Sequence, residues 1–256
     1  MRQISAIVVS TLRELLRKKD FYVLFILMGV FLAFMASQTF FGVQGVSRYV
    51  IDLGYSMAVI SSVIISVVTA ARPLPAEISS KTIYPLLAKP ISRLRVIVAE
   101  FFGSFVASVI SFSLFFGIFL YFYVSSGVTG SYVLIIQSYF LGIFLMCLVT
   151  SFSIFLSNFL TFSANVTISL LVYVMIVNFS SHIRSAFVSS NGVMSLVNGF
   201  IYYLLPHFEF YDIRVRVVHS WESLPAWLVG SIVLYTVLYC CALLMLSGAA
   251  FKRRGL

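Results

Sequence analysis

Apolar residues in this chain occur in long continuous stretches separated by short polar segments. Several stretches approach the roughly 20 residues that an α-helix needs to cross the hydrocarbon core of a bilayer. Because they are apolar all round rather than on one face, they predict membrane-spanning helices. We predict six spans, at residues 21–41, 53–71, 96–124, 131–157, 164–181 and 224–250. The predicted fold class is therefore an all-α polytopic membrane protein.

The composition agrees with this prediction and excludes two other classes. Hydrophobic residues make up 61% of the 256 residues and charged residues only 10%, whereas an average soluble domain is about 25% charged. The 16% of aromatic residues also excludes a disordered chain. No segment outside the spans is long enough for a soluble domain, so we expect residues 1–256 to form a single membrane domain.

The distribution of Lys and Arg predicts how the spans are oriented. With six spans, residues 1–20, 72–95, 158–163 and 251–256 lie on one side, and they hold 13 of the 17 basic residues. The other four are Arg48, Arg184, Arg214 and Arg216. Cytoplasmic loops carry the excess of basic residues, so we expect both termini in the cytoplasm. The net charge of +9 then indicates orientation rather than nucleic-acid binding.

Residues 1–20 predict an interfacial "elbow" helix before the first span. Apolar side chains that include Leu12 and Leu15 recur on one helical face, and basic side chains that include Arg13 and Arg17 occupy the other. This is the pattern of an amphipathic helix that lies in the membrane interface. It either anchors the chain and sets its topology or has a mechanical role. The segment leads into a basic cluster rather than a small-residue cleavage site, so no cleavable signal peptide is expected.

The loop at residues 72–95 is the most informative polar segment. Pro75 and Glu77 favour the start of a short helix, and Lys89-Pro90 favours its end. Four apolar side chains are then available for docking: Ile78, Ile83, Leu86 and Leu87. The alternative is a solvated loop whose basic residues only set the topology. Because a solvated loop has little use for Ile-Tyr-Pro-Leu-Leu, we favour a helix that binds a partner.

Residues 182–220 form an irregular region on the side opposite the termini. Within it, the apolar run at 193–205 ends at Pro206 and is too short to span a bilayer. We expect a re-entrant or interfacial helix there, packed against neighbouring spans so that its backbone groups are satisfied. The segment 181–189 is its expected partner.

The spans offer few groups for catalysis or ion coupling. Among the eight acidic residues only Glu100 falls inside a span, where we expect it to pair with Arg93 or Arg95. Intramembrane acids normally mark ion or proton pathways, so their scarcity argues against an ion-driven transporter. The sequence also has no P-loop and no protease or hydrolase motif. We expect that this chain is not an enzyme and that any ATPase is a separate chain.

Histidines and cysteines do not form a recognisable metal motif. His182, His207 and His219 match no short zinc or copper spacing. The three cysteines lie in apolar runs, where we expect them to pack as small hydrophobic residues: Cys147, Cys240 and Cys241. We therefore expect no metal or cofactor bound by this chain.

Small and polar residues inside the spans predict helix–helix contacts. A small-residue stripe on the third span permits close approach of a neighbour; it consists of Gly103, Ser104, Ala107, Ser108 and Ser111. Asn165, Thr167 and Asn178 either bond across helices or face a translocation path, and we favour the first. The Phe-rich outer half of the third span contacts either a lipid-like substrate or lipid, and we favour plain lipid exposure; its members are Phe112, Phe115, Phe116, Phe119 and Phe122.

The loop resembles the signature of ABC-2 type transporter permeases. It reads Glu77-x4-Thr82-Ile83-x2-Leu86-Leu87-x2-Pro90-x2-Arg93, and it is similar in particular to the multicopper-enzyme and nitrous-oxide-reductase maturation permeases. The elbow helix, the six spans and the re-entrant pair between spans five and six are also similar to that family. Two positions depart from the pattern, because Pro85 interrupts the coupling helix and Glu100 stands where relatives often carry Lys.

The resemblance implies a partner and a mechanism. Two permeases, as a homodimer or a heterodimer in the bilayer, would each dock one ATP-binding subunit that holds ATP and Mg²⁺. The coupling helix around residues 77–88 would sit in a cleft of the ATPase, with Thr82, Leu86 and Leu87 as the docking face. Glu77 and Arg93 would make polar contacts or fix the loop. The implied function is export across a bacterial-type plasma (inner) membrane. The alternative is an ATPase-driven scaffold that transmits force or assembles a periplasmic complex without moving a solute.

Overall fold

A computed structural model describes residues 19–37, 46–72, 93–125, 131–189, 199 and 205–253, and these contain helices but no β-strand. The long helices are α2 (Lys19–Ser37), α3 (Val46–Ala71), α6 (Arg93–Ser125), α7 (Tyr132–Ser157), α8 (Phe162–Ser189) and α11 (Ala226–Arg253). Two short helices, η2 (Phe208–Tyr211) and α10 (Arg214–Val218), lie between α8 and α11. Five helices are long and apolar enough to cross a membrane: α3, α6, α7, α8 and α11. The prediction of a helical chain with several membrane-type helices is thus confirmed, and α2 has a shorter apolar stretch, Phe25–Phe34.

Two helices extend beyond their predicted ends. Helix α3 begins at Val46 rather than at residue 53, because hydropathy marks only the apolar part of a helix that continues through Arg48 and Asp52. Helix α8 runs without interruption to Ser189, so the prediction of a separate segment at 181–189 is wrong. That stretch contains no Gly or Pro that would end a helix.

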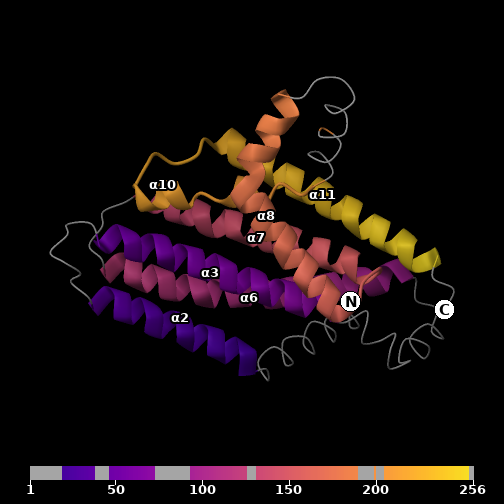
Figure 1. The fold of residues 1–256 in the computed structure, drawn as a ribbon, viewed down its shortest axis with the longest axis horizontal. Helices are drawn as coiled ribbons and strands as arrows, with labels where there is room; N and C mark the ends of the chain where they lie inside the picture. Colours follow the sequence, from indigo (N-terminus) through magenta and orange to yellow (C-terminus); the bar gives the residue numbers. More distant parts are fainter. Residues whose placement is uncertain are drawn as a thin grey trace.

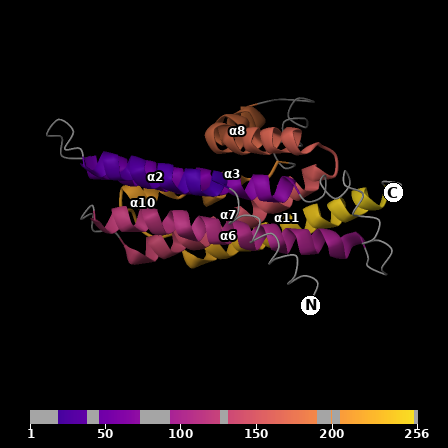
Figure 2. The same cartoon turned by 90° about the horizontal axis from the view of Figure 1, so that it is seen from below.

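Helices α3, α6 and α7 pack against one another at the centre of the bundle. Helix α2 packs on α3 and α6, α11 packs on α6 and α7, and α8 lies against α3 and α7 (Figures 1 and 2). Figure 2 shows α8 on one side of the bundle, with α6 and α11 on the opposite side. The two sides of α3 and α7 therefore face different neighbours.

The small-residue stripe of α6 is buried, in agreement with its predicted role in close packing. Ser104 donates a hydrogen bond to the Thr69 carbonyl oxygen of α3 at 3.4 Å. Gly142 of α7 plays the same role opposite Phe112, because a Cβ at this glycine would overlap the Phe112 ring. These contacts join α6 to both of its central neighbours.

The prediction that the Phe-rich half of α6 faces lipid is wrong. Phe112, Phe115, Phe116 and Phe119 are all at most 5% exposed, and only Phe122 is partly buried. The buried rings contact other rings across the bundle: Phe112 stacks on Tyr139 of α7, with centroids 5.7 Å apart, and Phe119 meets Tyr55 of α3 at 5.5 Å. Aromatic side chains gain from such specific ring contacts as well as from burial, so α6 turns this face to the core.

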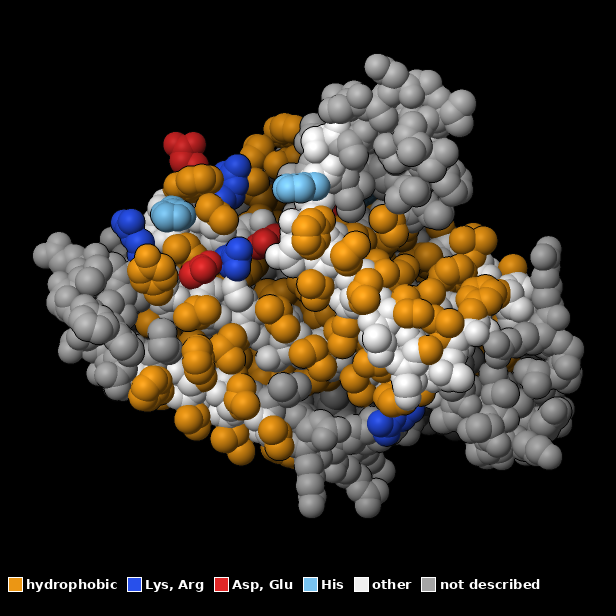
Figure 3. All heavy atoms as spheres, viewed as in Figure 1, with side chains coloured by type: hydrophobic (Ala, Val, Ile, Leu, Met, Phe, Trp, Pro, Cys, Tyr) orange, Lys and Arg blue, Asp and Glu red, His pale blue; other side chains and the backbone are white. Residues whose placement is uncertain are grey.

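Charged side chains gather at one end of the described structure, around α10 (Figure 3). At that end α10 contacts α3, and Arg214 of α10 lies 3.3 Å from Asp52 near the start of α3. Lys19 begins α2, Arg72 follows the last residue of α3 and Arg253 ends α11, and these helix ends are directed away from α10 (Figure 1). The polar segments thus divide between two ends with apolar helices between them.

Candidate binding pocket at the α10 end

Most residues predicted to couple to an ATPase lie outside the described residues. This holds for the elbow residues Leu12, Arg13, Leu15 and Arg17, and for the loop residues Glu77, Ile78, Thr82, Ile83, Leu86, Leu87 and Pro90. Arg93 is the first residue of α6. The predicted re-entrant helix at 193–205 falls almost entirely outside as well. The structure therefore describes only the helices that border these segments, and the roles of the elbow and loop residues stay predictions.

The remaining chemically interesting residues are dispersed. Glu100 is 5% exposed in the first turns of α6. His207 pairs with Glu209 at 3.0 Å, His219 stacks on Trp221 and His182 meets Phe179, so the three histidines have separate surroundings. No group of three His, Cys, Asp or Glu residues that could hold a metal occurs within the described ranges.

Two of the cysteines face each other across α7 and α11. The sulfur atoms of Cys147 and Cys240 lie 3.6 Å apart, and Ser151 donates to the Cys240 sulfur at 3.2 Å. Cys241, on the next position of α11, is exposed. The Cys147–Cys240 pair thus joins two helices, which the sequence spacing does not indicate.

The polar residues predicted to bond across helices do so in one case of three. Asn165 of α8 is fully buried and donates to the Ser153 carbonyl oxygen of α7 at 3.0 Å. Thr167 and Asn178 instead bond to carbonyl oxygens one turn earlier in α8, and both are exposed. For those two residues the prediction is wrong, because the bonds they make within the described residues stay inside α8, and Asn178 instead lines a cavity between α3 and α8.

The segment between α8 and α11 is fixed to α11 at η2. The Tyr211 hydroxyl lies 2.6 Å from the Thr236 hydroxyl, and the Tyr235 hydroxyl accepts a hydrogen bond from the His207 backbone N–H at 3.1 Å. Burial raises the pKa of Tyr211 well above its ordinary value, so this phenol stays neutral and remains available to donate to Thr236. Together these bonds attach η2 to one face of α11.

A second attachment holds the chain just before α11 against α7. The side-chain amide of Gln137 donates to the Leu224 carbonyl oxygen and accepts from the Leu224 N–H, both at 2.9 Å. The amide therefore bonds to the backbone as a neighbouring strand would. Its two bonds hold Leu224, two residues before α11 begins, against α7.

Arg214 attaches α10 to α3. Its Nη1 donates to the Ser56 hydroxyl at 3.0 Å and its Nε lies 3.3 Å from Asp52 Oδ1. Its backbone N–H donates to Asp212 Oδ1 at 3.1 Å. This cation and two carboxylates lie at the end of an apolar bundle, where charges are costly unless they are paired or functional.

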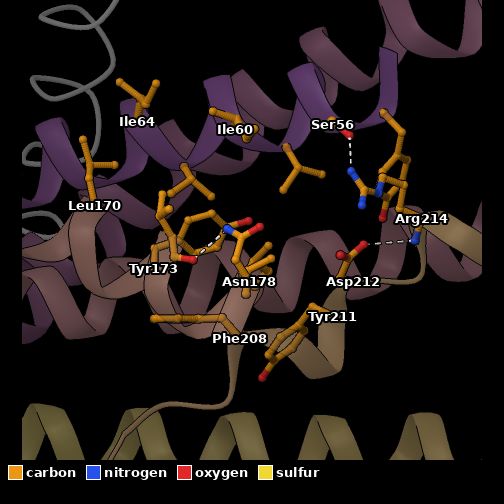
Figure 4. A pocket seen from close by; sticks show the side chains of 16 residues that line it. Ser56, Ile60, Ile64, Leu170, Tyr173, Asn178, Phe208, Tyr211, Asp212 and Arg214 are labelled. Carbon is orange, nitrogen blue, oxygen red and sulfur yellow. Dashed lines mark hydrogen bonds between the residues drawn. The ribbon is translucent and has the colours of Figure 1, made fainter. Parts of the chain in front are cut away.

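A cavity of about 270 Å³ begins at this cluster and runs between α3 and α8. Its polar end is formed by Ser56, Asp212 and Arg214, and its far end by Ile64 and Leu170 (Figure 4). Four aromatic residues also line it: Tyr55, Tyr173, Phe208 and Tyr211. Figure 4 shows that the Tyr211 hydroxyl points away from the cavity, in agreement with its bond to Thr236. Asn178 of α8 adds a side-chain amide between the two ends (Figure 4). A mostly apolar cavity with a few polar groups is the usual form of a small-molecule binding site.

Comparisons with protein-family models and with curated proteins find no match to this chain. The fold itself defines the class: the described residues form an all-helical bundle with five membrane-type helices. The polar cluster at the α10 end and the adjoining cavity form a site that is polar at one end and mostly apolar along its length.

This pocket is not evident from the sequence. Arg214 and Asp212 stand out as charges close to apolar segments, but residues 52 and 56 are more than 150 positions away. One signal in the sequence relates them: a carboxylate, Asp52, stands at the start of one span, and a cation, Arg214, stands in the segment between two other spans. Without the helix packing, that signal does not say which span receives Arg214.

Proposed function

We propose that this protein is the permease subunit of an ABC-2 type exporter, driven by ATP hydrolysis in a separate ATP-binding subunit. The observation that carries the proposal is the loop motif between α3 and α6, with its apolar docking residues. The order of helices also supports it, since α2, α3, α6, α7 and α8 are followed by the short helices η2 and α10 and then by α11. In a homodimer or a heterodimer, each copy binds one ATPase at the loop.

The packing of α3 gives a route by which the loop acts on the rest of the bundle. Arg72, at the end of α3, lies over the Phe162 ring at the start of α8, with 5.1 Å between the guanidinium carbon and the ring centroid. Ser56, which lines the pocket, lies earlier in the same helix, about 24 Å from Arg72 at a rise of 1.5 Å per residue. A displacement of the loop therefore moves α3 relative to α8, and the pocket lies between these two helices.

The low number of charges in the spans supports an external energy source. Glu100 is the one acid within the predicted spans other than those at their edges. Ion-coupled transporters normally use intramembrane acids or histidines for their ions. Energy from a docked ATPase does not require such groups.

The direct test is whether a P-loop ATPase co-purifies with the protein from native membranes. We expect Leu87→Glu and Glu77→Ala to reduce ATPase retention at least tenfold. The matched controls are Val215→Glu, on the exposed face of α10, and Glu222→Ala, which is exposed at the same end. Retention of the ATPase by both loop variants, or its absence from the wild-type protein, would contradict the proposal.

A second measurement separates export from the scaffold alternative. The protein is reconstituted with its ATPase in liposomes, and ATP hydrolysis and solute accumulation are followed together. Export predicts that a solute both stimulates hydrolysis and accumulates. Hydrolysis that responds to a periplasmic partner, with no solute moved, favours the scaffold.

A further inference from the structure

We propose that the pocket between α3, α8 and α10 binds a phospholipid with a zwitterionic headgroup. The head contacts Arg214 and Asp212, and part of one acyl chain lies along the apolar groove between α3 and α8. This inference goes beyond the proposed function. It needs no ATPase and is tested by binding alone.

The apolar part of the pocket opens to the side of the bundle. Ile60 of α3 and Val174 of α8 both line it, and they are 51% and 53% exposed. Both residues lie in the middle of helices that are long and apolar enough to cross a membrane. In a bilayer this opening faces hydrocarbon, so acyl chains have direct access to the groove.

The length of the pocket matches one leaflet. From Ser56 at the polar end to Ile64 at the apolar end, α3 rises about 12 Å at 1.5 Å per residue. The hydrocarbon core of a bilayer is about 30 Å thick, so each leaflet contributes about 15 Å. A chain that starts at the polar cluster therefore reaches the apolar end near the middle of the membrane.

The volume accommodates part of a lipid. An apolar cavity of about 150 Å³ holds one benzene molecule, and this pocket has about 270 Å³. The pocket therefore accommodates part of the headgroup and the first part of one acyl chain. The rest of the lipid leaves through the side opening into the bilayer.

Arg214 has hydrogen-bond donors to spare for a phosphate. A guanidinium group has five N–H donors, and within the described residues this one makes a single side-chain hydrogen bond, to Ser56. Its Nε is buried near Asp52 but makes no hydrogen bond. Arginine binds phosphate oxygens with paired N–H donors, and Arg214 lines the pocket.

Asp212 supplies the complementary charge for an ammonium group. It lines the pocket and is exposed, and its one hydrogen bond among the described residues is from the Arg214 backbone N–H. Arg214, Asp52 and Asp212 together carry one net negative charge. An anionic head would bring a phosphate to Arg214 but no cation to Asp212, whereas a zwitterionic head matches both.

The test is native mass spectrometry of the purified full-length protein in detergent, titrated with dioleoyl lipids. We expect phosphatidylethanolamine to bind about tenfold more tightly than phosphatidylglycerol, which corresponds to about 1.4 kcal/mol. Arg214→Gln should weaken the binding of both lipids, because both carry the phosphate, whereas Asp212→Asn should remove the preference, because Asp212 meets the ammonium group that only phosphatidylethanolamine has. Arg216→Gln and Glu222→Gln, which alter the neighbouring charges that do not line the pocket, should keep it.

A further variant and a soluble competitor also test the proposal. Val174→Trp fills the side opening without touching the polar cluster, so it should weaken lipid binding even where an Arg214 variant fails to fold. Soluble O-phosphoethanolamine tests the source of the headgroup, and it should compete only weakly because it lacks a chain. Equal binding of phosphatidylglycerol, equal loss in Arg216→Gln, unchanged binding in Val174→Trp, or binding of O-phosphoethanolamine as tight as the lipid would each overturn the proposal.

Discussion

The contact between Gly142 of α7 and Phe112 of α6 gives a sharp test of how the central helices pack. A Cβ built on Gly142 would lie 2.6 Å from Phe112 Cε1 and 3.1 Å from Cε2, and closer still to Cζ. The Phe112 ring is fully buried and stacks on Tyr139, with ring planes 14° apart. It also meets Phe116 at 5.5 Å. The ring therefore has no free direction in which to move when Gly142→Ala adds one methyl group.

The expected cost follows from two opposing terms. Overpacking a well-packed interior by one carbon costs about 1–3 kcal/mol, and overlap with more than one ring atom places this site at about 3 kcal/mol. Alanine in a helix interior is favoured over glycine by about 1 kcal/mol. We therefore expect Gly142→Ala to destabilise the protein by about 2 kcal/mol. Gly117→Ala should stabilise it slightly, because a Cβ at this position of α6 meets nothing within 4 Å.

The assay is thermal unfolding in detergent micelles, with both variants compared with the wild-type protein. A double variant completes the experiment, since Phe112→Leu shortens the side chain that opposes position 142. In combination with Gly142→Ala it should cost less than the two single changes added together. If Gly142→Ala is tolerated as well as Gly117→Ala, or if the two changes simply add, the close α6–α7 packing described above is wrong.

Three other changes test the attachments between helices by the same unfolding assay. Asn165→Ala should lower stability by about 0.6 kcal/mol, the average for interhelical hydrogen bonds in membranes, and by at most about 1.7 kcal/mol. Thr167→Ala in the same helix should have almost no effect, and a reversed order would refute the assignment. Gln137→Leu leaves two backbone groups of Leu224 without partners and should cost about 1–3 kcal/mol, so a neutral result would show that Gln137 does not hold the start of α11. Tyr211→Phe, which removes only the hydroxyl bonded to Thr236, should cost about 1 kcal/mol, and no change would exclude that bond.

The helices themselves were largely predictable because apolar length is a direct requirement of a bilayer. The predicted spans overlap α2, α3, α6, α7, α8 and α11. Their ends were less predictable, since α8 continues through polar residues to Ser189 while hydropathy ends near residue 181. A helix stops where its backbone geometry is interrupted, and hydropathy does not record that.

The faces of the helices were the part that hydropathy does not reveal. In a membrane both the core and the lipid are apolar, so a row of Phe residues on α6 has the same composition whether it faces inward or outward. Gly142 is more informative than the row of Phe residues, because a glycine in the middle of a helix indicates a close neighbour. The sequence does not show which helix supplies that neighbour. The same reasoning applies to the pocket. Arg214 needs a partner wherever it lies near hydrocarbon, yet only the packing of α10 on α3 identifies Asp52 and Ser56 and leaves Asp212 free to face the groove.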